Sequence, residues 1–432
     1  MTSHAYVRSA MLGPQKAPAS ETGAIRWMRE NLFSGWLNTV LTIASLYAVY
    51  LIVGTIGPWL SRSVWNASSL EECRTIITTR YGEGATGACF AVVHERWQQI
   101  LFGFYPRDLY WRPTLTLGLM LVALGPVLFS WVPRQLLWFS LLFPAIAFWL
   151  LWGGSVWLPV MIMVGFAAGY LVYVLITPLN GLAGIIAAVL VPVLWWLFLC
   201  APLASAIHTV LPFGLRQMQS DDFGGFLLSS VIGISGIAFS LPIGILLALG
   251  RQSDMLIVKS FCVGFIEGLR GVPLITLLFV ASLLLNYFLP PGTEFDIILR
   301  VVIMVTLFSA AYMAEVIRGG LAALPRGQYE AADALGLDYW QAQRQIIMPQ
   351  ALKVAIPGIV GNFIGLFKDT TLVSLISLQD PLALVSSIRA NTEWNGVYWE
   401  LFIFVGFLFF IFCFSMSRYS MYLENKLRTD HR

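Results

Sequence analysis

The distribution of apolar residues limits what this chain can fold into more than any other feature. About ten apolar runs, each long enough to cross a bilayer as a helix, follow one another through the sequence. Charged residues make up only 11% of the chain, against roughly 25% in a typical soluble domain. The sequence therefore predicts an all-α polytopic membrane protein. The spans are expected at about 36–60, 114–131, 136–152, 158–176, 183–206, 224–249, 260–289, 297–317, 356–378 and 397–419.

The two ends of the chain predict its orientation. Residues 1–36 contain prolines, glycine and small polar residues but no long apolar run, and are expected to form a cytoplasmic tail. The first apolar run starts too late and is too long for a signal peptide, so we expect it to be retained as a span. Basic residues before this run favour a cytoplasmic N-terminus. Ten spans then place the basic tail at 426–432 in the cytoplasm as well.

The first half of the chain contains one long polar insertion, at 61–112, which this orientation places on the outer, periplasmic side. It carries Cys73 and Cys89, which an oxidising compartment would allow to pair. Such a bridge would close a loop of roughly 15 residues and contribute about 3 kcal/mol. The alternative is two unpaired thiols in a surface loop. Six arginines in this insertion run against the positive-inside rule.

The two halves of the chain differ in polarity. The apolar runs within 37–222 contain almost no ionisable residue, which predicts an accessory transmembrane region of five helices with a lipid-facing or scaffolding role. Within 223–425 the runs carry embedded polar and charged residues, which predicts a functional core of five helices. The run at 260–289 is long enough to require a kink, which Gly271 and Pro273 would supply.

The loop at 318–355 has the most distinctive pattern. It is rich in basic residues and is therefore expected on the cytoplasmic side. An alanine-rich helical turn would end at a glycine in the left-handed conformation, and a second helix at 339–347 would be stopped by a proline. The residues that define the pattern are Glu330, Ala331, Ala332, Gly336, Ile346 and Pro349.

This spacing resembles the EAA loop of ABC-importer permeases, with Met348 where the family usually has leucine. The stretches 268–273, 311–320 and 368–372 are similar to signatures of the histidine/glutamine branch, which transports polar amino acids; Val272 replaces the usual threonine. Over its whole length the chain resembles the M-type membrane subunits of bacterial general L-amino-acid importers. The resemblance implies that 223–425 form a type I permease core and that the loop is the coupling helix.

The resemblance also implies partners. These are a cytoplasmic ABC ATPase that binds ATP and Mg, a second related Q-type permease subunit in a heterodimer, a periplasmic amino-acid-binding protein, an amino-acid substrate, and the lipid bilayer of the bacterial inner membrane. The chain itself has no phosphate-binding loop, and a net charge of +3 gives no indication of a nucleic-acid partner. Its four histidines are too scattered to form a metal site. We therefore expect a transport subunit without enzymatic activity, metal or cofactor.

Charged residues inside the core runs are candidates for a substrate path. Lys368 and Asp369 are expected near the middle of a span, where Asp369 could bind the ammonium group of an amino acid while Lys368 or Arg270 binds its carboxylate. The alternative is that these charges hold helices or subunits together, with Lys368 and Asp369, and Glu267 and Arg270, paired with each other or with a partner subunit. Gating or loop anchoring is expected of Glu315 and Arg318. The other residues of the predicted path are Asn362, Thr370, Thr371 and Ser374.

These features predict the permease subunit of an ATP-driven, binding-protein-dependent amino-acid importer. The alternative is an ion-driven secondary amino-acid transporter, which would have similar repeats in its two halves, whereas the halves here differ in polarity. A membrane scaffold or an intramembrane enzyme would leave the loop at 318–355 unexplained.

Overall fold

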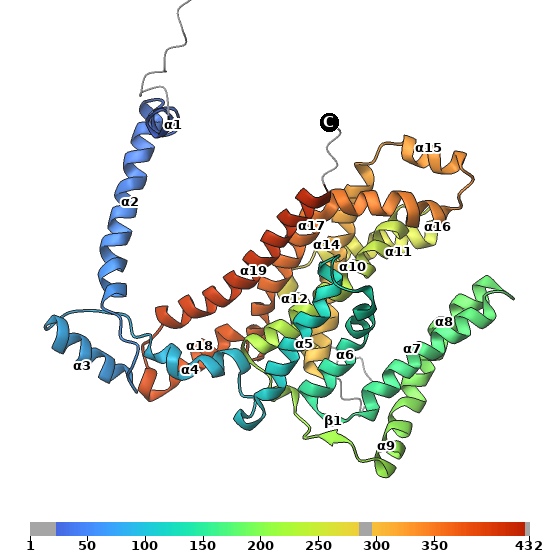
Figure 1. Cartoon of the computed structure of the whole chain (residues 1–432), viewed down its shortest axis with the longest axis horizontal. Coiled ribbons are helices and arrows are strands. Elements are labelled where there is room, and N and C mark those ends of the chain that lie inside the picture. Colours follow the sequence, from blue (N-terminus) through green and yellow to red (C-terminus); the bar gives the residue numbers. More distant parts are fainter. Residues whose placement is uncertain (1–22, 285–295, 428–432) are drawn as a thin grey trace, which may run out of the picture. The chain divides into compact units, whose positions relative to one another are not determined.

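The computed structural model describes residues 23–284 and 296–427, and these are almost entirely helical (Figure 1). Within them, nine helices are long and apolar enough to cross a membrane, and a bent helix pair could supply a tenth span. The contacts divide the chain into two compact units, Met1–Val92 and Val93–Arg432.

The first unit contains a long apolar helix and a disulfide-bonded segment. Helix α2 (Trp36–Ser61) buries none of its residues against the rest of the chain, as expected of a helix that contacts lipid. Ser69 caps helix α3 (Leu70–Tyr81) by accepting a hydrogen bond from the Glu72 N–H. Cys73 and Cys89 are buried and joined by a disulfide, so the alternative of two unpaired thiols does not apply to this structure. A short helix, α1 (Gly23–Asn31), precedes α2.

The second unit begins with the rest of the accessory region. Its helices pair as hairpins, α5 with α6 and α7 with α8, whereas α6 and α7 meet less extensively. A short antiparallel sheet also forms, in which β1 (Gly154–Ser155) pairs with β2 (Gly214–Leu215). The helices are α4 (Ala91–Phe102), α5 (Trp111–Leu128), α6 (Leu137–Trp152), α7 (Trp157–Ile176), α8 (Gly181–Leu194) and α9 (Cys200–Val210).

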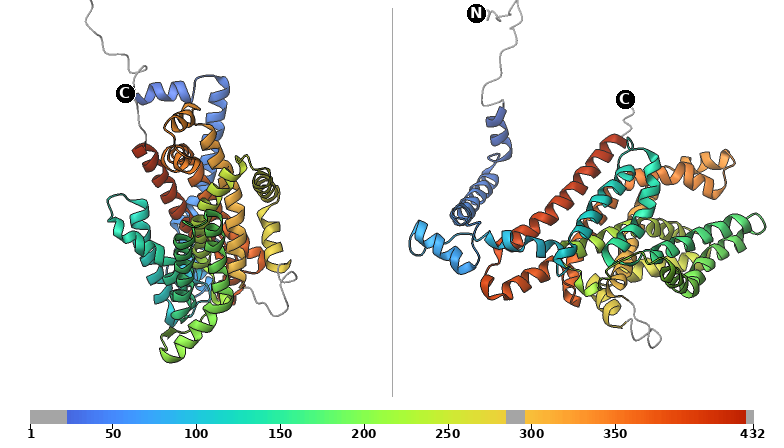
Figure 2. Two further views of the ribbon diagram at one scale, coloured as in Figure 1. Left: turned by 90° about the vertical axis from the view of Figure 1, so that its right-hand side faces the viewer. Right: turned by 60° about the horizontal axis from the view of Figure 1, so that its bottom comes forward.

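The core follows, built around α10, α14 and α17, which pack along one another. Glycines permit this close contact: Gly244 leaves room for Met313, and Gly320 leaves room for the backbone of Ala351. Figure 2 shows α19, in dark red, as one long helix along this core. The core helices are α10 (Gly225–Arg251), α11 (Leu256–Arg270), α12 (Leu274–Phe279), α14 (Ile297–Ala322), α15 (Gly327–Ala334), α16 (Tyr339–Ala342), α17 (Met348–Asp369), α18 (Pro381–Ala390) and α19 (Trp399–Leu427).

The predicted kink is a sharp bend. Helix α11 ends at Arg270, and α12 with the π-helical turn that follows it is inclined to α11 by 102°. Pro273 precedes the first residue of α12, where its missing N–H removes no helical hydrogen bond. The segment 256–284 is therefore a broken helix rather than one kinked span, and the end of the span predicted at 260–289 lies outside the described residues.

One predicted helix end is wrong. Pro349 does not stop the helix that begins at Tyr339; helical structure continues to Ile376. The chain widens into a π-helical turn at Gln343–Ile347, and Pro349 then occupies one of the first positions of α17. Proline is tolerated there because the N–H groups of a first turn lack helical acceptors.

The boundary between compact units also differs from the sequence-based division at 222/223. Part of the accessory region packs tightly against the beginning of the core. The ring of Phe223 stacks on Trp152 at 4.4 Å and meets Tyr105 edge-on at 5.7 Å. The Tyr105 hydroxyl donates a 2.8 Å hydrogen bond to the Leu151 carbonyl. These buried contacts place α5 to α9 in the same unit as the core.

Candidate functional site

The loop between α14 and α17 is a helical hairpin whose turn depends on glycine. Gly336 has a φ of +68°, as the sequence predicted for a left-handed residue at the end of α15. Its N–H donates to the Asp333 carbonyl at 2.9 Å, and the Leu337 N–H donates to the Ala332 carbonyl at 3.2 Å. An added Cβ at Gly336 would meet no atom within 4 Å, so the cost of substituting it is conformational rather than steric.

The second arm of the hairpin has a well-defined start. The Asp338 carboxylate accepts the Gln341 N–H at 2.8 Å, and the Gln341 side chain accepts the Asp338 N–H at 3.2 Å. This reciprocal arrangement is a capping box, which satisfies donors that a helix N-terminus otherwise leaves free. The direction in which α16 leaves the turn is therefore fixed by local chemistry.

The hairpin has one face toward the core and one face exposed. Ala332 and Ile347 are buried, and Gln343 is buried beside them. Leu335, Tyr339 and Trp340 are exposed, which is unusual for large apolar side chains on a polar loop. This exposed surface is suited to docking another protein. The predicted coupling residues Glu330, Ala331, Gly336 and Pro349 are also exposed, and Ile346 is half-buried.

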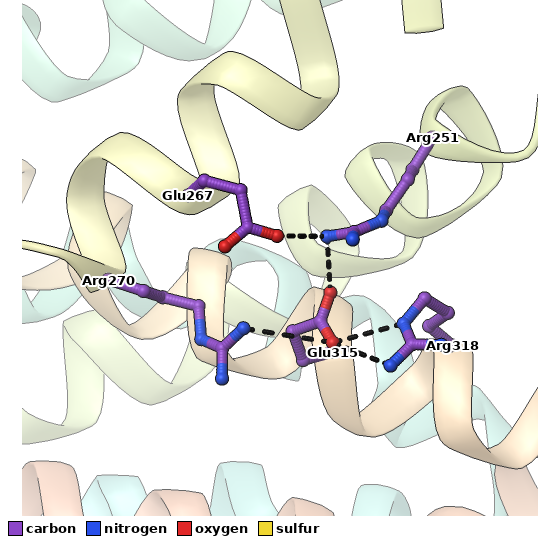
Figure 3. A network of polar contacts seen from close by, with 5 residues as sticks. All are labelled: Arg251, Glu267, Arg270, Glu315 and Arg318. Carbon is purple, nitrogen blue, oxygen red and sulfur yellow. Dashed lines mark hydrogen bonds and ion pairs between the residues drawn. The ribbon is translucent and has the colours of Figure 1, made fainter.

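A cluster of ionised side chains lies on the helices that lead to this hairpin (Figure 3). Glu315 of α14 is its centre: its carboxylate is 2.6 Å from an Arg251 nitrogen, 2.9 Å from an Arg318 nitrogen and 3.7 Å from an Arg270 nitrogen. Arg251 also contacts Glu267 at 2.9 Å. Three helices, α10, α11 and α14, therefore meet through one carboxylate and its guanidinium partners.

The cluster around Glu315 lies where two helices of the core end. Arg251 is the last residue of α10, and Arg270 is the last residue of α11, immediately before the 102° bend. Arg270 also lies over the ring of Tyr312, 5.3 Å from its centroid. The Glu315 side chain is only 15% exposed, so its ion pairs are screened less than pairs at a free surface.

Two sequence-based expectations about these charges need correction. Glu267 and Arg270 were considered as partners three residues apart, but each contacts a residue of another helix instead. Arg251 was not predicted as a member of the site. The only signal in the sequence was its place at the end of an apolar run, where a basic residue is usually explained by membrane orientation.

Lys368 and Asp369 occupy a different place. They end α17, where the helix narrows to the 3₁₀ helix Thr370–Ile376, rather than lying in mid-span. Within the described residues no ion pair joins Lys368 to Asp369; Lys368 is exposed and Asp369 half-buried. The hydroxyls of Thr370, Thr371 and Ser374 donate to carbonyls of the preceding turn.

The predicted substrate path therefore falls into two groups. Val316, beside Glu315, packs against Gly358, and Asp369 lies eleven residues further along α17, or about 16 Å by helical rise. Arg270 therefore lies with the Glu315 cluster, at a different level of α17 from Asp369. Asn362 lies between the two levels and donates to the Ser309 hydroxyl at 3.1 Å, which ties α17 to α14.

Known proteins share this architecture. The model of the family described as "Binding-protein-dependent transport system inner membrane component" matches residues 240–429. The chain is 62% identical, over the full length of both proteins, to the "Glutamate/glutamine/aspartate/asparagine transport system permease protein BztC" of Rhodobacter capsulatus. It is 36% identical, over 96% of each protein, to the "Inner membrane amino-acid ABC transporter permease protein YhdY" of Escherichia coli K12. The chain belongs to the amino-acid ABC transporter permease family.

Family membership confirms the predicted fold class and function and removes the ion-driven alternative. The protein is a multi-pass membrane permease, a transport component rather than an enzyme. A shorter relative, the "Glutamate/aspartate import permease protein GltK" of Escherichia coli O157:H7, is 32% identical over 208 residues, which are 91% of that protein but 47% of this chain. The accessory region of this permease therefore lies largely outside what the shorter relative shares.

Proposed function

We propose that this permease forms part of the translocation path for acidic and amide amino acids and is driven through its exposed hairpin by a separate ATPase. The hairpin geometry carries the proposal: an exposed face with Leu335, Tyr339 and Trp340 is joined through the buried Ala332 and Ile347 to the core. The name of BztC, with glutamate, glutamine, aspartate and asparagine, supports this substrate class.

The proposed assembly contains a cytoplasmic ABC ATPase that binds ATP and Mg, a second, related Q-type permease subunit, and a periplasmic amino-acid-binding protein. The family description, which names a binding-protein-dependent transport system of the inner membrane, supports it. We place both termini and the hairpin in the cytoplasm of a bacterial cell, because basic residues flank the first span and the hairpin.

The second arm of the hairpin continues directly into the core. Helical structure runs from Tyr339 to Ile376, so a displacement of α16 is carried into α17. Gly320 brings α14 into backbone contact with Ala351, so α14 moves with it. ATP-driven closure of the ATPase would therefore displace both helices that flank the loop.

The cluster around Glu315 is the proposed second link. It joins α14 to the end of α10 and to α11 just before the bend, so movement of α14 is passed to the broken helix. Within this proposal Glu315 and Arg318 anchor the loop-bearing helix, and Glu267 and Arg270 position the bend. Lys368, Asp369 and the hydroxyls that follow them remain the proposed substrate-facing group.

A matched pair of glycine substitutions tests the coupling. Gly336→Val forces a β-branched residue into the left-handed region, whereas Gly327→Val changes a glycine of the same hairpin that has an ordinary φ and open space around it. In proteoliposomes with the ATPase and binding protein, ATP-dependent glutamate uptake should fall about tenfold or more for the first variant and change little for the second. Uptake by the unmodified protein that persists without the ATPase would overturn the proposal.

A further inference from the structure

The core has a cavity on the side opposite the coupling hairpin. Its volume is about 690 Å³, and it is open to the surface, because six of its nine described lining residues are exposed. Ser374 of the 3₁₀ helix after α17, Gln379, and Ser386 and Ser387 of α18 line it, with the ring of Phe402 from α19. Ser374 belongs to the proposed substrate-facing group, so the cavity adjoins the proposed path.

The lining determines what the cavity can accept. Three hydroxyls and one carboxamide can donate and accept hydrogen bonds, and the rest of the described lining is apolar. None of the described lining residues is ionisable. Such a site can hydrogen-bond both ends of a zwitterion without excluding acidic or amide side chains by charge, which suits a substrate class that contains both.

One wall of the cavity comes from the accessory region. Phe104, in the turn after α4, lines the cavity together with the core residues, and its side chain is 49% exposed. The sequence predicted only a lipid-facing or scaffolding role for the accessory region. Phe104 therefore brings part of this region to a site that the sequence assigned to the core alone.

Glycines hold the turn that carries Phe104 in place. Gly103 forms an antiparallel bridge with Phe223, and the Gly225 N–H donates to the Gln379 carbonyl at 2.7 Å. A Cβ on Gly103 would overlap the backbone of Gly224, and one on Gly224 would lie 2.9 Å from the Gln379 carbonyl oxygen. Three backbone segments are thus stacked without side chains between them: the accessory turn, the start of α10 and the segment before α18.

A second attachment lies on the same side of the core. Arg96 of α4 contacts Glu393, which follows α18, at 3.4 Å. The glycine contact links the turn after α4 to the segment before α18 through Gly224 and Gly225, and Arg96 links α4 to the segment after α18. Both contacts limit the movement of the turn that carries Phe104 relative to α18.

We propose that this cavity is the entry vestibule for the amino acid and that Phe104 is a positioning residue in its wall, contributed by the accessory region. The inference rests on the proposed function, because it needs a substrate that arrives on the side opposite the ATPase. The accessory region then takes part in substrate admission, and its attachment to α18 keeps the vestibule in shape.

The test places a thiol at Phe104. In a background with Cys200, Cys262 and Cys413 replaced by alanine, Phe104→Cys is labelled with a membrane-impermeant, sulfonate-bearing methanethiosulfonate. The control is Phe213→Cys, an exposed phenylalanine next to β2 that does not line the cavity. ATP-dependent uptake of labelled glutamate and glutamine is measured in proteoliposomes containing the complete transporter, before and after labelling.

Labelling at position 104 should slow uptake of both amino acids about tenfold, because the added group fills space that the substrate must occupy. Labelling at position 213 should change uptake less than about twofold. Unchanged uptake by the labelled Phe104→Cys protein, or no reaction with the reagent, would overturn the vestibule while leaving the importer function intact. Failure of the proposed function is recognised separately, by ATPase-independent uptake before any label is added.

As a second variant, Phe104→Ala removes the ring without adding bulk. It should raise the KM for uptake while leaving the maximal rate and the amount of assembled protein unchanged. A purely structural role would instead reduce the amount of assembled protein without changing KM. That result would also contradict the inference.

Discussion

Helices α7 and α14 have the same mean hydropathy, 2.1, over their most apolar stretch, yet the structure uses them differently. In α14, 56% of that stretch is buried inside the chain, whereas in α7 the share is 17%. Helix α14 packs along α10, α11 and α17, whereas α7 packs mainly along α8 and α9. Hydropathy identifies a helix that can cross a membrane, but the arrangement of neighbouring helices decides how much of it is buried inside the chain.

The accessory region and the core also differ in their charged residues. Helices α6 to α9 contain no acidic or basic residue among their described positions, apart from His208, whereas α14 carries Arg300, Glu315 and Arg318. The Arg300 guanidinium donates a hydrogen bond to the Ser282 carbonyl at 2.8 Å, and Glu315 forms ion pairs with three arginines. Charged residues of the core thus link its helices, whereas the accessory hairpins are joined by apolar contacts and by hydrogen bonds from Ser140, Trp195 and Trp196 to backbone carbonyls.

The largest effect is expected where helices meet at a glycine. Gly320→Leu would drive a side chain into the backbone of Ala351, and we expect a loss of about 3 kcal/mol or more of stability and little folded protein. Gly118→Leu in α5, where an added Cβ meets nothing within 4 Å, should be tolerated. Thermal unfolding in detergent compares the two. Equal tolerance would show that the core is no more tightly packed than the accessory helices.

A buried carboxyl gives the core a pH dependence. Asp380 is fully buried and caps α18 by accepting the Leu382 and Ala383 N–H groups, and burial raises its pKa to about 6. Because this pKa lies above that of the unfolded chain, the stability contribution is complete below about pH 4 and is lost as pH rises through 6.

The change between pH 4 and 7 should amount to about 3 kcal/mol at most, from 1.36 kcal/mol for each pKa unit. Asp380→Asn keeps one of the two hydrogen bonds of the cap and removes the titration. Its unfolding midpoint should therefore vary less with pH than that of the parent protein. An identical pH profile in the two proteins would contradict this assignment.

Two substitutions in the cluster around Glu315 should differ in how much they lower stability and uptake. Glu315→Gln leaves three guanidiniums without their shared carboxylate and should cost about 2 kcal/mol of stability and slow ATP-dependent uptake. Glu267→Gln removes one contact of a side chain that is 54% exposed, and should cost less than about 1 kcal/mol. Thermal unfolding and uptake are measured on both. A larger effect for Glu267→Gln than for Glu315→Gln would contradict the assignment of Glu315 as the centre of the cluster.

The smallest expected effect on stability is at a hydrogen bond between the accessory region and the core. The Tyr419 hydroxyl of α19 donates to the Leu128 carbonyl at the end of α5, at 2.5 Å. Tyr419→Phe should lower stability by about 1 kcal/mol. Tyr422→Phe, one turn further along α19, is the control and should have no measurable effect on the unfolding midpoint. If the two variants behave alike, this hydrogen bond does not hold α5 to the core.

Several features followed from the sequence alone because they depend on neighbouring residues. Runs of apolar residues predicted the spans, and the αL conformation of Gly336 followed from its place after an alanine-rich helix. The bend near Pro273 was predicted, although its size was not. The stop at Pro349 was wrong because a π-helical turn, which depends on tertiary packing, placed this proline at the start of α17.

Contacts between distant residues were decided only by the tertiary structure. The sequence alone could not select Arg251 as the partner of Glu267 and Glu315, because pairing depends on how α10, α11 and α14 pack. Nor could it bring Phe104 to the cavity beside α18, since that depends on three backbone segments meeting at glycines. Hydropathy and turn chemistry act over a few residues, whereas ion pairs and close backbone contacts join residues that are far apart in the chain.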